Sequence, residues 1–267
     1  PLPEEAVRRL AAQSSELMVV EDGQPVVEEG VKALLGSGYR VRGRLTGDLP
    51  RTGELTPDCV AQALGCPERE GAAEARQVVG RPPALCPGCG HRDVYAALHV
   101  AEYPEARIFG DIGCYTLGAL PPFSALASCV DMGASITMAK GAADGGLFPA
   151  IAVIGDSTFT HSGMTGLLDA VNDGSNITVI ISDNLTTAMT GGQDSAGTSK
   201  FEAICVGLGV APEHVRVVVP LPKNMPEITR ILREEINYQG VSVIIPRREC
   251  IQTLSRKLRQ QKQKKES

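Results

Sequence analysis

Two short stretches of the chain place oxygen-bearing side chains directly after apolar segments. The segment FPAIAVIGDS ends in Gly155, Asp156 and Ser157, and the segment NITVIISDN ends in Asp183 and Asn184. The interval between Asp156 and Asn184 leaves room for one helix-bearing crossover between neighbouring parallel strands, whose carboxyl ends meet at one edge of a sheet. A carboxylate and an amide oxygen suit Mg²⁺, which usually binds through few protein groups together with phosphates.

The residues beside these strand ends favour a phosphate at the same place. Gly155 allows close approach of a ligand to the backbone, and Ser157 and the N–H groups that open the next helix could hold a phosphate. Asp, Asn and Gly also commonly end strands and cap helices, so GDS alone would more often be structural. The pair of strand ends, followed by the TGGQ loop, favours a diphosphate and Mg²⁺ site. Thr190 and Gln193 of that loop could bond substrate or diphosphate, or the loop could simply make a turn.

Eight cysteines offer a second kind of chemistry. Cys86 and Cys89 form a CPGC motif whose prolines and glycines favour an open loop that wraps a metal, although CxxC alone also suits zinc or a redox disulfide. Because the start PLPEEAVRRL does not resemble a signal peptide, we expect reduced thiols or metal ligation rather than a disulfide framework. The remaining cysteines outside the candidate sites are predicted as small core residues (Cys129 and Cys205) or as part of a linker and its helix (Cys59 and Cys66).

Two histidines stand close to these motifs. His161 follows Asp156 by five positions, and His91 directly follows the CxxCG sequence. Each could bind a substrate carboxylate or assist proton transfer, and each could equally be a capping or surface residue. His99 and His214 are predicted to be structural or exposed.

Hydrophobic patterning predicts the elements that hold these residues. Short β-branched segments alternate with amphipathic helical stretches over residues 85–250, which indicates an α/β fold: a parallel sheet with helices on both faces. Ligands of such sheets bind outside the carboxyl ends of the strands. Residues 1–48 read as α-β-α-β, a small partial α/β segment that we expect to be the end of a preceding domain. Residues 49–84 read as a linker with a short helix from Thr56, and residues 251–267 as a basic tail that forms a solvated helix.

Composition narrows the classes of partner. The 267 residues carry a net charge of −5 and are 43% hydrophobic, so no basic field indicates a nucleic acid partner. No apolar run approaches the length of a membrane span, so we expect no membrane partner and a cytoplasmic location.

The motifs together resemble a known family. GDS followed at this interval by DN resembles the binding motif for thiamine diphosphate (ThDP). With CPGCGHRD, GDIGCYTLG, DMGASITMAKG and DNLTTAMTGGQ, roughly residues 80–250 resemble the ThDP domain of the 2-oxoacid:ferredoxin oxidoreductases. Within that family the resemblance is strongest to the alpha subunit of the enzymes that act on indolepyruvate. Residues 1–70 more weakly resemble the end of the domain that precedes it. The resemblance implies a fold of the ThDP diphosphate-binding type.

The resemblance also implies roles for individual residues. Asp156 and Asn184 would be side-chain ligands of Mg²⁺, and Thr186 would offer its backbone carbonyl. The residues expected beside the diphosphate are Gly133, Gly155 and Ser157, and those expected beside the thiamine rings are Gly110, Asp111, Ile112 and Gly113. The cysteines expected to hold a 4Fe-4S cluster are Cys86, Cys89, Cys114 and Cys250.

The family's reaction is the oxidative decarboxylation of a 2-oxoacid to acyl-CoA, with electrons passed through the cluster to ferredoxin. The implied partners are a pyrimidine-binding domain or subunit that activates ThDP, a gamma-type subunit, ferredoxin, the 2-oxoacid and coenzyme A, in an oligomer. We therefore expect this chain to be inactive alone. Two alternatives are the ThDP-binding half of a non-oxidative 2-oxoacid decarboxylase, which would need no cluster cysteines, and a non-catalytic scaffold in which the CxxC motif holds zinc.

Overall fold

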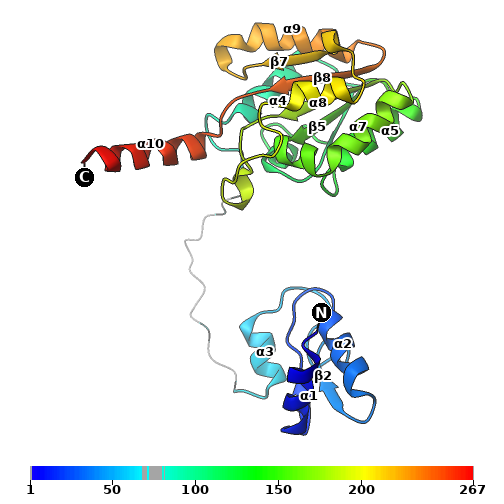
Figure 1. Cartoon of the computed structure of the whole chain (residues 1–267), viewed down its shortest axis with the longest axis vertical. Helices are drawn as coiled ribbons and strands as arrows, with labels where there is room; N and C mark the ends of the chain where they lie inside the picture. Colours follow the sequence, from blue (N-terminus) through cyan, green and yellow to red (C-terminus); the bar gives the residue numbers. More distant parts are fainter. Residues whose placement is uncertain (1, 68–70, 72–79, 81, 267) are drawn as a thin grey trace. The chain divides into compact units, whose positions relative to one another are not determined.

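Short strands and amphipathic helices alternate along the chain in the computed structural model, which describes residues 2–67, 71, 80 and 82–266 (Figure 1). The chain divides into two units, Pro1–Val79 and Gly80–Ser267. The predicted linker falls partly on residues 68–70, 72–79 and 81, which lie outside the described residues.

The unit Pro1–Val79 has the predicted α-β-α-β order. Its elements are α1 (Glu4–Ala12), β1 (Glu16–Met18), α2 (Val26–Leu35), β2 (Arg40–Arg42) and α3 (Pro57–Ala63). Strands β1 and β2 pair in parallel. The Thr56 hydroxyl accepts a hydrogen bond from the Cys59 N–H and so caps α3, where the sequence predicted a helix to start. Arg42 donates to the Ala63 carbonyl and ties α3 to β2, so part of the predicted linker packs with the N-terminal elements. The predicted domain boundaries remain predictions.

The unit Gly80–Ser267 is built on a six-stranded sheet with the order β4-β3-β5-β6-β8-β7. Every neighbouring pair is parallel. The strands are β3 (Arg107–Gly110), β4 (Ser128–Cys129), β5 (Ala150–Gly155), β6 (Ile177–Ser182), β7 (Val215–Val218) and β8 (Val241–Pro246). Five of them are the predicted strands, and β4 is a two-residue edge strand that patterning did not reveal.

Helices cover both faces of this sheet (Figure 1). One core packs α5 (Ala134–Asp144), α7 (Met164–Asn172) and α8 (Phe201–Gly207) on the sheet, and the other packs α4 (Gly90–Ala101) and α9 (Met225–Ile236). Strand β5 shows the alternation that permits this arrangement, because Ala152 and Ile154 enter the first core whereas Ile151 and Val153 enter the second. The predicted fold class is confirmed.

Short elements complete the unit. They are the 3₁₀ helices η1 (Cys114–Ala119), η3 (Ala188–Thr190), η4 (Pro212–His214) and η5 (Pro222–Asn224), the helical turn α6 (Asp156–Thr158), the π-helical turn η2 (Phe159–Gly163) and the C-terminal α10 (Ile251–Glu266). Helix α10 is the solvated helix predicted for the basic tail, and its side chains from Leu254 to Gln261 are exposed. None of the helices in the described part of the chain is long and apolar enough to cross a membrane.

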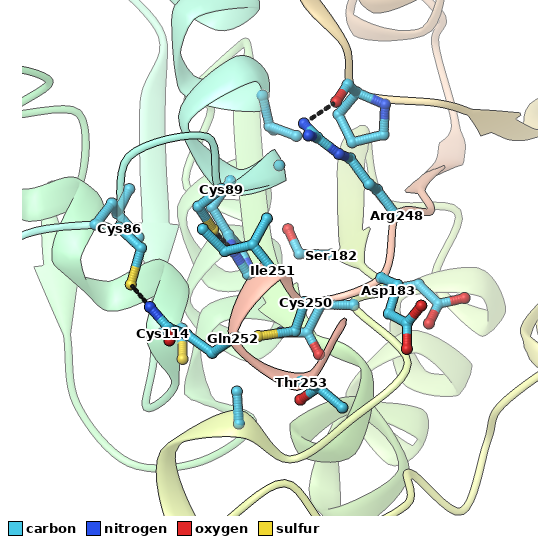
Figure 2. A pocket seen from close by; sticks show the side chains of 18 of the residues that line it. Cys86, Cys89, Cys114, Ser182, Asp183, Arg248, Cys250, Ile251, Gln252 and Thr253 are labelled. Atoms are coloured by element: carbon cyan, nitrogen blue, oxygen red, sulfur yellow. Dashed lines mark hydrogen bonds between the residues drawn. The ribbon is translucent and has the colours of Figure 1, made fainter. Parts of the chain in front are cut away.

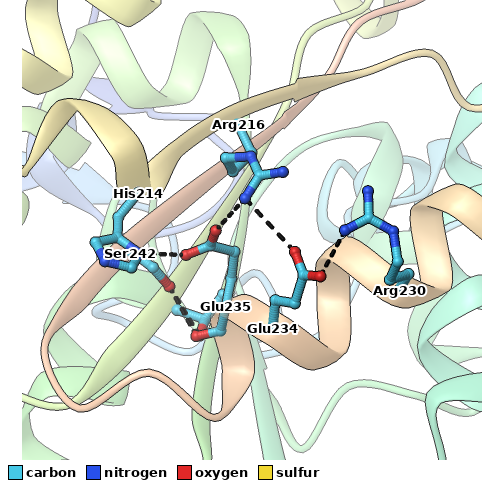
Figure 3. Close-up of polar contacts among 7 residues, drawn as sticks. His214, Arg216, Arg230, Glu234, Glu235 and Ser242 are labelled. Carbon is cyan, nitrogen blue, oxygen red and sulfur yellow. Dashed lines mark hydrogen bonds and ion pairs between the residues drawn. The ribbon is translucent and has the colours of Figure 1, made fainter.

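A buried carboxylate anchors α9 at the amino-terminal end of the strands (Figure 3). Glu235 accepts hydrogen bonds from His214 Nδ1 at 2.8 Å and from Arg216 at 3.0 Å. The Ser242 hydroxyl at the start of β8 donates to the Glu235 carbonyl at 3.1 Å. The contacts from His214 and Arg216 satisfy a carboxylate charge that would be costly if it were buried alone, and the Ser242 bond satisfies the backbone carbonyl. They give His214 the structural role that the sequence predicted.

The two cysteines predicted as core residues differ in their solvent exposure. Cys205 of α8 is fully buried, as predicted, but Cys129 is exposed and that prediction was wrong. Cys129 ends β4, which pairs with β3 and lies at one edge of the sheet. An apolar flanking sequence therefore does not bury this thiol, because it stands at the end of an edge strand.

Candidate functional site

Charged residues follow four strands at one edge of the sheet. Asp111 follows β3, Asp156 follows β5, Asp183 follows β6 and Arg247 follows β8. Strands β3, β5 and β6 are direct neighbours, with Gly155 in register with Ser182. The predicted adjacency of the two acidic strand ends is therefore confirmed.

The side chains of Asp156 and Asn184 converge on one backbone group. The Thr186 N–H donates to Asp156 Oδ2 at 3.2 Å and to Asn184 Oδ1 at 3.1 Å. The second carboxylate oxygen of Asp156 accepts the N–H of Ser157 at 2.6 Å. A carboxylate oxygen and an amide oxygen thus lie around one point, which is a donor set that suits a small hard cation.

Burial shapes the electrostatics of this pair. Asp156 is 3% exposed, and burial, together with the nearby Asp183 charge, raises its pKa to about 6. Asp183 is buried too, and Arg247 Nε holds it at 2.6 Å. Because a nearby cation favours the ionised form of a carboxyl, a metal at Asp156 would reverse the rise in its pKa.

The buried Asp111 carboxylate accepts hydrogen bonds from the start of helix α5. Its Oδ2 accepts the Gly133 N–H at 3.0 Å, the Ser135 N–H at 3.2 Å and the Ser135 hydroxyl at 2.7 Å. These are the groups that open α5, so Asp111 caps this helix from a neighbouring strand. Gly133 has φ +96°, a conformation that glycine adopts readily.

Tyr115 lies beneath two glycines of the strand ends. Its hydroxyl donates to Asp111 Oδ1 and lies 3.2 Å from the Ile112 carbonyl oxygen. A Cβ at Gly155 would lie 2.6 Å from the Tyr115 ring, and one at Gly113 would lie 2.2 Å from it. Both glycines are therefore required by the close approach of this ring. Gly110, one residue before Asp111, is hemmed in by Leu126 in the same way.

The loops after β5 and β6 carry the other predicted residues. The Ser157 hydroxyl lies 2.6 Å from the Thr187 hydroxyl, which joins the two loops. His161 is exposed on the π-helical turn η2, and its Nδ1 lies 3.0 Å from the Ser162 hydroxyl. Such single π turns often occur at functional sites.

The TGGQ loop closes on itself. The Thr190 hydroxyl donates to Gln193 Oε1 at 2.7 Å, and Gln193 Nε2 donates to the Thr190 carbonyl at 2.9 Å. Both side chains are exposed. These side-chain hydrogen bonds stabilise the turn, as expected if the loop simply makes a turn. A role of Thr190 and Gln193 in binding substrate or diphosphate stays a prediction.

Four cysteines line one cavity of about 190 Å³ beside the strand-end site (Figure 2). They come from distant parts of the chain: Cys86, Cys89, Cys114 and Cys250. Asp183 and Asn184 also line this cavity. The Cys250 N–H donates to the Asn184 carbonyl at 3.0 Å, so the cavity and the Asp156–Asn184 pair share a wall.

The thiols of this cavity influence one another. Burial is the main cause that raises the pKa of Cys114 to about 11, and the neighbouring Cys250, Cys89, Cys86 and Asp156 contribute to this rise. Burial likewise raises the pKa of Cys89. Among the residues that the structure describes, no group of three or more His, Cys, Asp or Glu side chains could hold a metal ion. The four thiolates that hold a four-iron cluster need not converge on one point, because each binds a different iron of a cage.

His91 lies against this cavity and is buried. Its Nδ1 is 3.0 Å from Cys89 Sγ, and its ring stacks on Tyr115. Burial lowers the pKa of His91 to about 4, so the imidazole is neutral near pH 7.

The comparisons with known proteins identify the family to which this chain belongs. The chain matches the family described as thiamine pyrophosphate enzyme, C-terminal TPP binding domain, over residues 111–245; thiamine pyrophosphate is another name for ThDP. The chain therefore belongs to the thiamine pyrophosphate enzymes. The matched span begins at Asp111 and ends within β8, so it contains both strand ends of the candidate metal site.

Curated relatives of this chain include subunits of indolepyruvate oxidoreductases. The chain is 34% identical over 276 residues to the indolepyruvate oxidoreductase subunit IorA of Methanothermobacter thermautotrophicus, in an alignment that covers 94% of this chain and 44% of the relative. It is 36% identical over 286 residues to the subunit of the same name from Archaeoglobus fulgidus, covering 98% of this chain and 45% of the relative. The chain thus spans less than half the length of these relatives. These matches confirm the family resemblance that the motifs indicated.

A solved structure supports the fold. The 2-oxoglutarate:ferredoxin oxidoreductase from Magnetococcus marinus, with 2-oxoglutarate, coenzyme A and succinyl-CoA bound, superimposes with a TM-score of 0.52 at 17% sequence identity. The match covers 64% of this chain and 66% of that chain. At this identity the likeness concerns the fold alone.

Proposed function

We propose that this chain is the ThDP- and Mg²⁺-binding portion of a 2-oxoacid:ferredoxin oxidoreductase that acts on indolepyruvate or a similar acid. The whole enzyme would convert the 2-oxoacid to an acyl-CoA and pass the electrons through a 4Fe-4S cluster to ferredoxin. One observation carries the proposal: the hydrogen bond from the Cys250 N–H to the Asn184 carbonyl joins the Asp156–Asn184 pair to the four-cysteine cavity.

The strand-end residues fit a diphosphate held through Mg²⁺. Asp156 Oδ2 and Asn184 Oδ1 would bind the ion, with the Thr186 carbonyl as the proposed third protein ligand. Gly133, Gly155 and Ser157 would lie beside the diphosphate, and residues 110–113 beside the thiamine rings. When bound, ThDP supplies the carbanion chemistry, and the protein groups position it.

The chain's own residues have distinct tasks in this proposal. Asp156 supplies the negative charge that holds the cation, while Arg247 neutralises the neighbouring Asp183. Asp111 fixes the start of α5 and so shapes the wall of the site. His161, exposed on the turn that follows Asp156, is the residue we assign to binding the substrate carboxylate or to proton transfer.

The cysteine cavity distinguishes this function from the non-oxidative alternative. A decarboxylase half would need no set of four thiols around one cavity, whereas a 4Fe-4S cluster is held by four Cys thiolates. The same cavity favours a cluster over a single zinc ion, for which three or four ligands must converge on one point. The chain spans less than half of its curated relatives, so we propose that a pyrimidine-binding domain or subunit, a gamma-type subunit and further copies complete the enzyme.

The test of the cofactor proposal is binding of ThDP to the full chain purified without oxygen. Calorimetry should detect binding that requires Mg²⁺ and is lost in Asp156→Ala. The matched control is Asp194→Ala, because Asp194 is an exposed loop carboxylate outside the proposed site. Equal binding by wild type and Asp156→Ala, or binding without Mg²⁺, would contradict the assignment of the metal ligands.

Iron and acid-labile sulfide analysis tests the cluster. We expect four irons per chain in wild type and a loss of iron in Cys114→Ser. Cys129→Ser is the matched control, since this exposed thiol is not part of the cavity. Chain that binds ThDP but never holds iron or sulfide would instead favour the non-oxidative decarboxylase.

A further inference from the structure

His91 occupies a sheltered position between the cysteine cavity and the strand-end site. It lies in the first turn of α4, two residues after Cys89, and its side chain is 5% exposed. Its Nδ1 is 3.0 Å from Cys89 Sγ. On its other side the Tyr115 ring stacks on the imidazole, with centroids 6.3 Å apart and planes at 27°.

Coordination chemistry fixes the direction of the bond between His91 and Cys89. A cysteine that binds iron does so as a thiolate and has no proton to donate. The contact can then be a hydrogen bond only if Nδ1 carries the hydrogen and donates it to sulfur. Such a bond stabilises the more negative, reduced form of a cluster more than the oxidised form. Hydrogen bonds to the sulfurs are accordingly one of the properties that set the reduction potential.

Tyr115 is in turn held in place. Its hydroxyl donates to Asp111, which caps α5. Its ring fills the space left by Gly113 and Gly155 at two strand ends. The imidazole therefore rests on a ring that has little freedom to move, and its hydrogen-bonding atom stays directed at Cys89.

We propose that His91 raises the reduction potential of the cluster by donating its Nδ1–H to Cys89 Sγ, with Tyr115 fixing the imidazole for this bond. The proposal rests on the proposed function, because it requires the cluster at the four cysteines. It makes His91 a positioning residue that acts through Cys89, which differs from the substrate-binding role that its place in the sequence suggested.

The test is a potentiometric titration of the cluster in the full chain, followed by electron paramagnetic resonance. His91→Phe keeps an aromatic ring against Tyr115 and removes the donor. At a fixed applied potential, we expect its ratio of reduced to oxidised cluster to fall by up to about tenfold, which is a shift of about 59 mV to lower potential for one electron. His91→Asn should recover at least half of the shift, because its amide nitrogen can take the place of Nδ1.

Controls separate this proposal from the one on which it rests. His99→Phe, on an exposed side chain of the same helix, should leave the potential unchanged. Iron and sulfide contents must be equal in all variants, and His91→Leu replaces His91→Phe if the latter holds no cluster. Equal potentials in wild type and the donor-less variants at full cluster content overturn this inference and leave the proposed function standing. A chain that never assembles a cluster overturns both.

Discussion

The backbone N–H of Cys250 donates to the carbonyl of Asn184 at 3.0 Å, although 65 residues lie between them in the chain. This bond is possible because β8 pairs beside β6, so that the segments after the two strands run together. Through it, a residue proposed to bind iron positions a residue proposed to bind Mg²⁺. A backbone hydrogen bond thus joins the proposed iron site to the proposed Mg²⁺ site.

Removal of the cluster should therefore weaken ThDP binding. Without iron, Cys250 is held less firmly and the Asn184 loop is freer, so we expect the Mg²⁺-dependent affinity of the assembled enzyme for ThDP to fall by about fivefold. Calorimetry before and after iron chelation measures the change. Chelator treatment of protein that has never been loaded with iron is the control, and it should have no effect. Unchanged affinity after cluster removal would contradict the coupling.

Tyr115→Phe should destabilise the fold through Asp111. The variant keeps the ring beneath Gly113 and Gly155 but removes the hydroxyl that donates to the buried Asp111 carboxylate. Losing a hydrogen bond to a charged group lowers the free energy of unfolding by about 1.5–3 kcal/mol. Urea unfolding measures this, and Tyr103→Phe, at a tyrosine whose hydroxyl bonds are exposed, should change stability by less than about 0.5 kcal/mol. Similar values for the two variants would argue against the role of the Tyr115 hydroxyl.

Arg247→Met should destabilise the fold more strongly. It leaves the Asp183 carboxylate, whose side chain is fully buried, without its cationic partner. Breaking such a pair from one side costs about 3 kcal/mol or more. Adding Asp183→Asn to the variant should recover part of the loss, because no uncompensated buried charge then remains; the other partner of Arg247, Glu202, is 40% exposed. Arg230→Met, which breaks an exposed pair with Glu234, is the control and should cost less than about 1 kcal/mol.

Local sequence patterns predicted most strands of the main sheet and the proximity of the two strand ends at the candidate site. Apolar segments bounded by Gly, Asp or Pro identified five strands of the main sheet, and the consecutive strands β5 and β6 were expected to be neighbours. Asp156 and Asn184 could be paired for that reason. The short strand β4 has too few residues to show a pattern, and the exposure of Cys129 at its end could not be foreseen.

The contacts that sequence reasoning missed are made between segments that lie far apart in the chain. Arg247 reaches Asp183 because β8 inserts between β6 and β7, an order that no periodicity reveals. Asp111 was expected beside the thiamine rings, which stays a prediction, and sequence reasoning missed that its carboxylate caps α5, whose start lies more than twenty positions further on. Tyr115 links these elements, and the GDIGCYTLG motif offers its only signal: glycines close to an aromatic residue.

The pair Glu202–Arg247 should make stability depend on pH. The bidentate contact from the Arg247 guanidinium, at 2.9 and 2.8 Å, lowers the pKa of Glu202 below its ordinary value of 4.5. The ionised pair therefore stabilises the fold above about pH 4.5, and this contribution is lost as the pH falls through the lowered pKa. Since Glu202 is 40% exposed, we expect Glu202→Gln to cost about 0.5–1 kcal/mol at pH 7. Thermal unfolding over a series of pH values from 7 downward should show the difference between the two proteins shrinking as the pH falls below 4.5; a difference independent of pH would exclude the ion pair as its cause.

Cysteine labelling should sort seven of the eight thiols into three groups. In cluster-free chain, the exposed Cys66 and Cys129 should react first with an alkylating agent. Cys205 should react only on unfolding, because it is fully buried and burial raises the pKa of its thiol to about 12. Mass spectrometry of digests taken over time measures each rate.

Loading the chain with iron and sulfide should then change the reactivity of the cavity thiols alone. The four cavity thiols, which are half-buried without a cluster, should become resistant once they are bound to iron, whereas Cys66 and Cys129 should react as before. These two cysteines are the internal control, since any general tightening of the fold would slow them as well. Protection of fewer than four cavity cysteines would mean that one of the proposed ligands is wrong, and the unprotected residue would identify it.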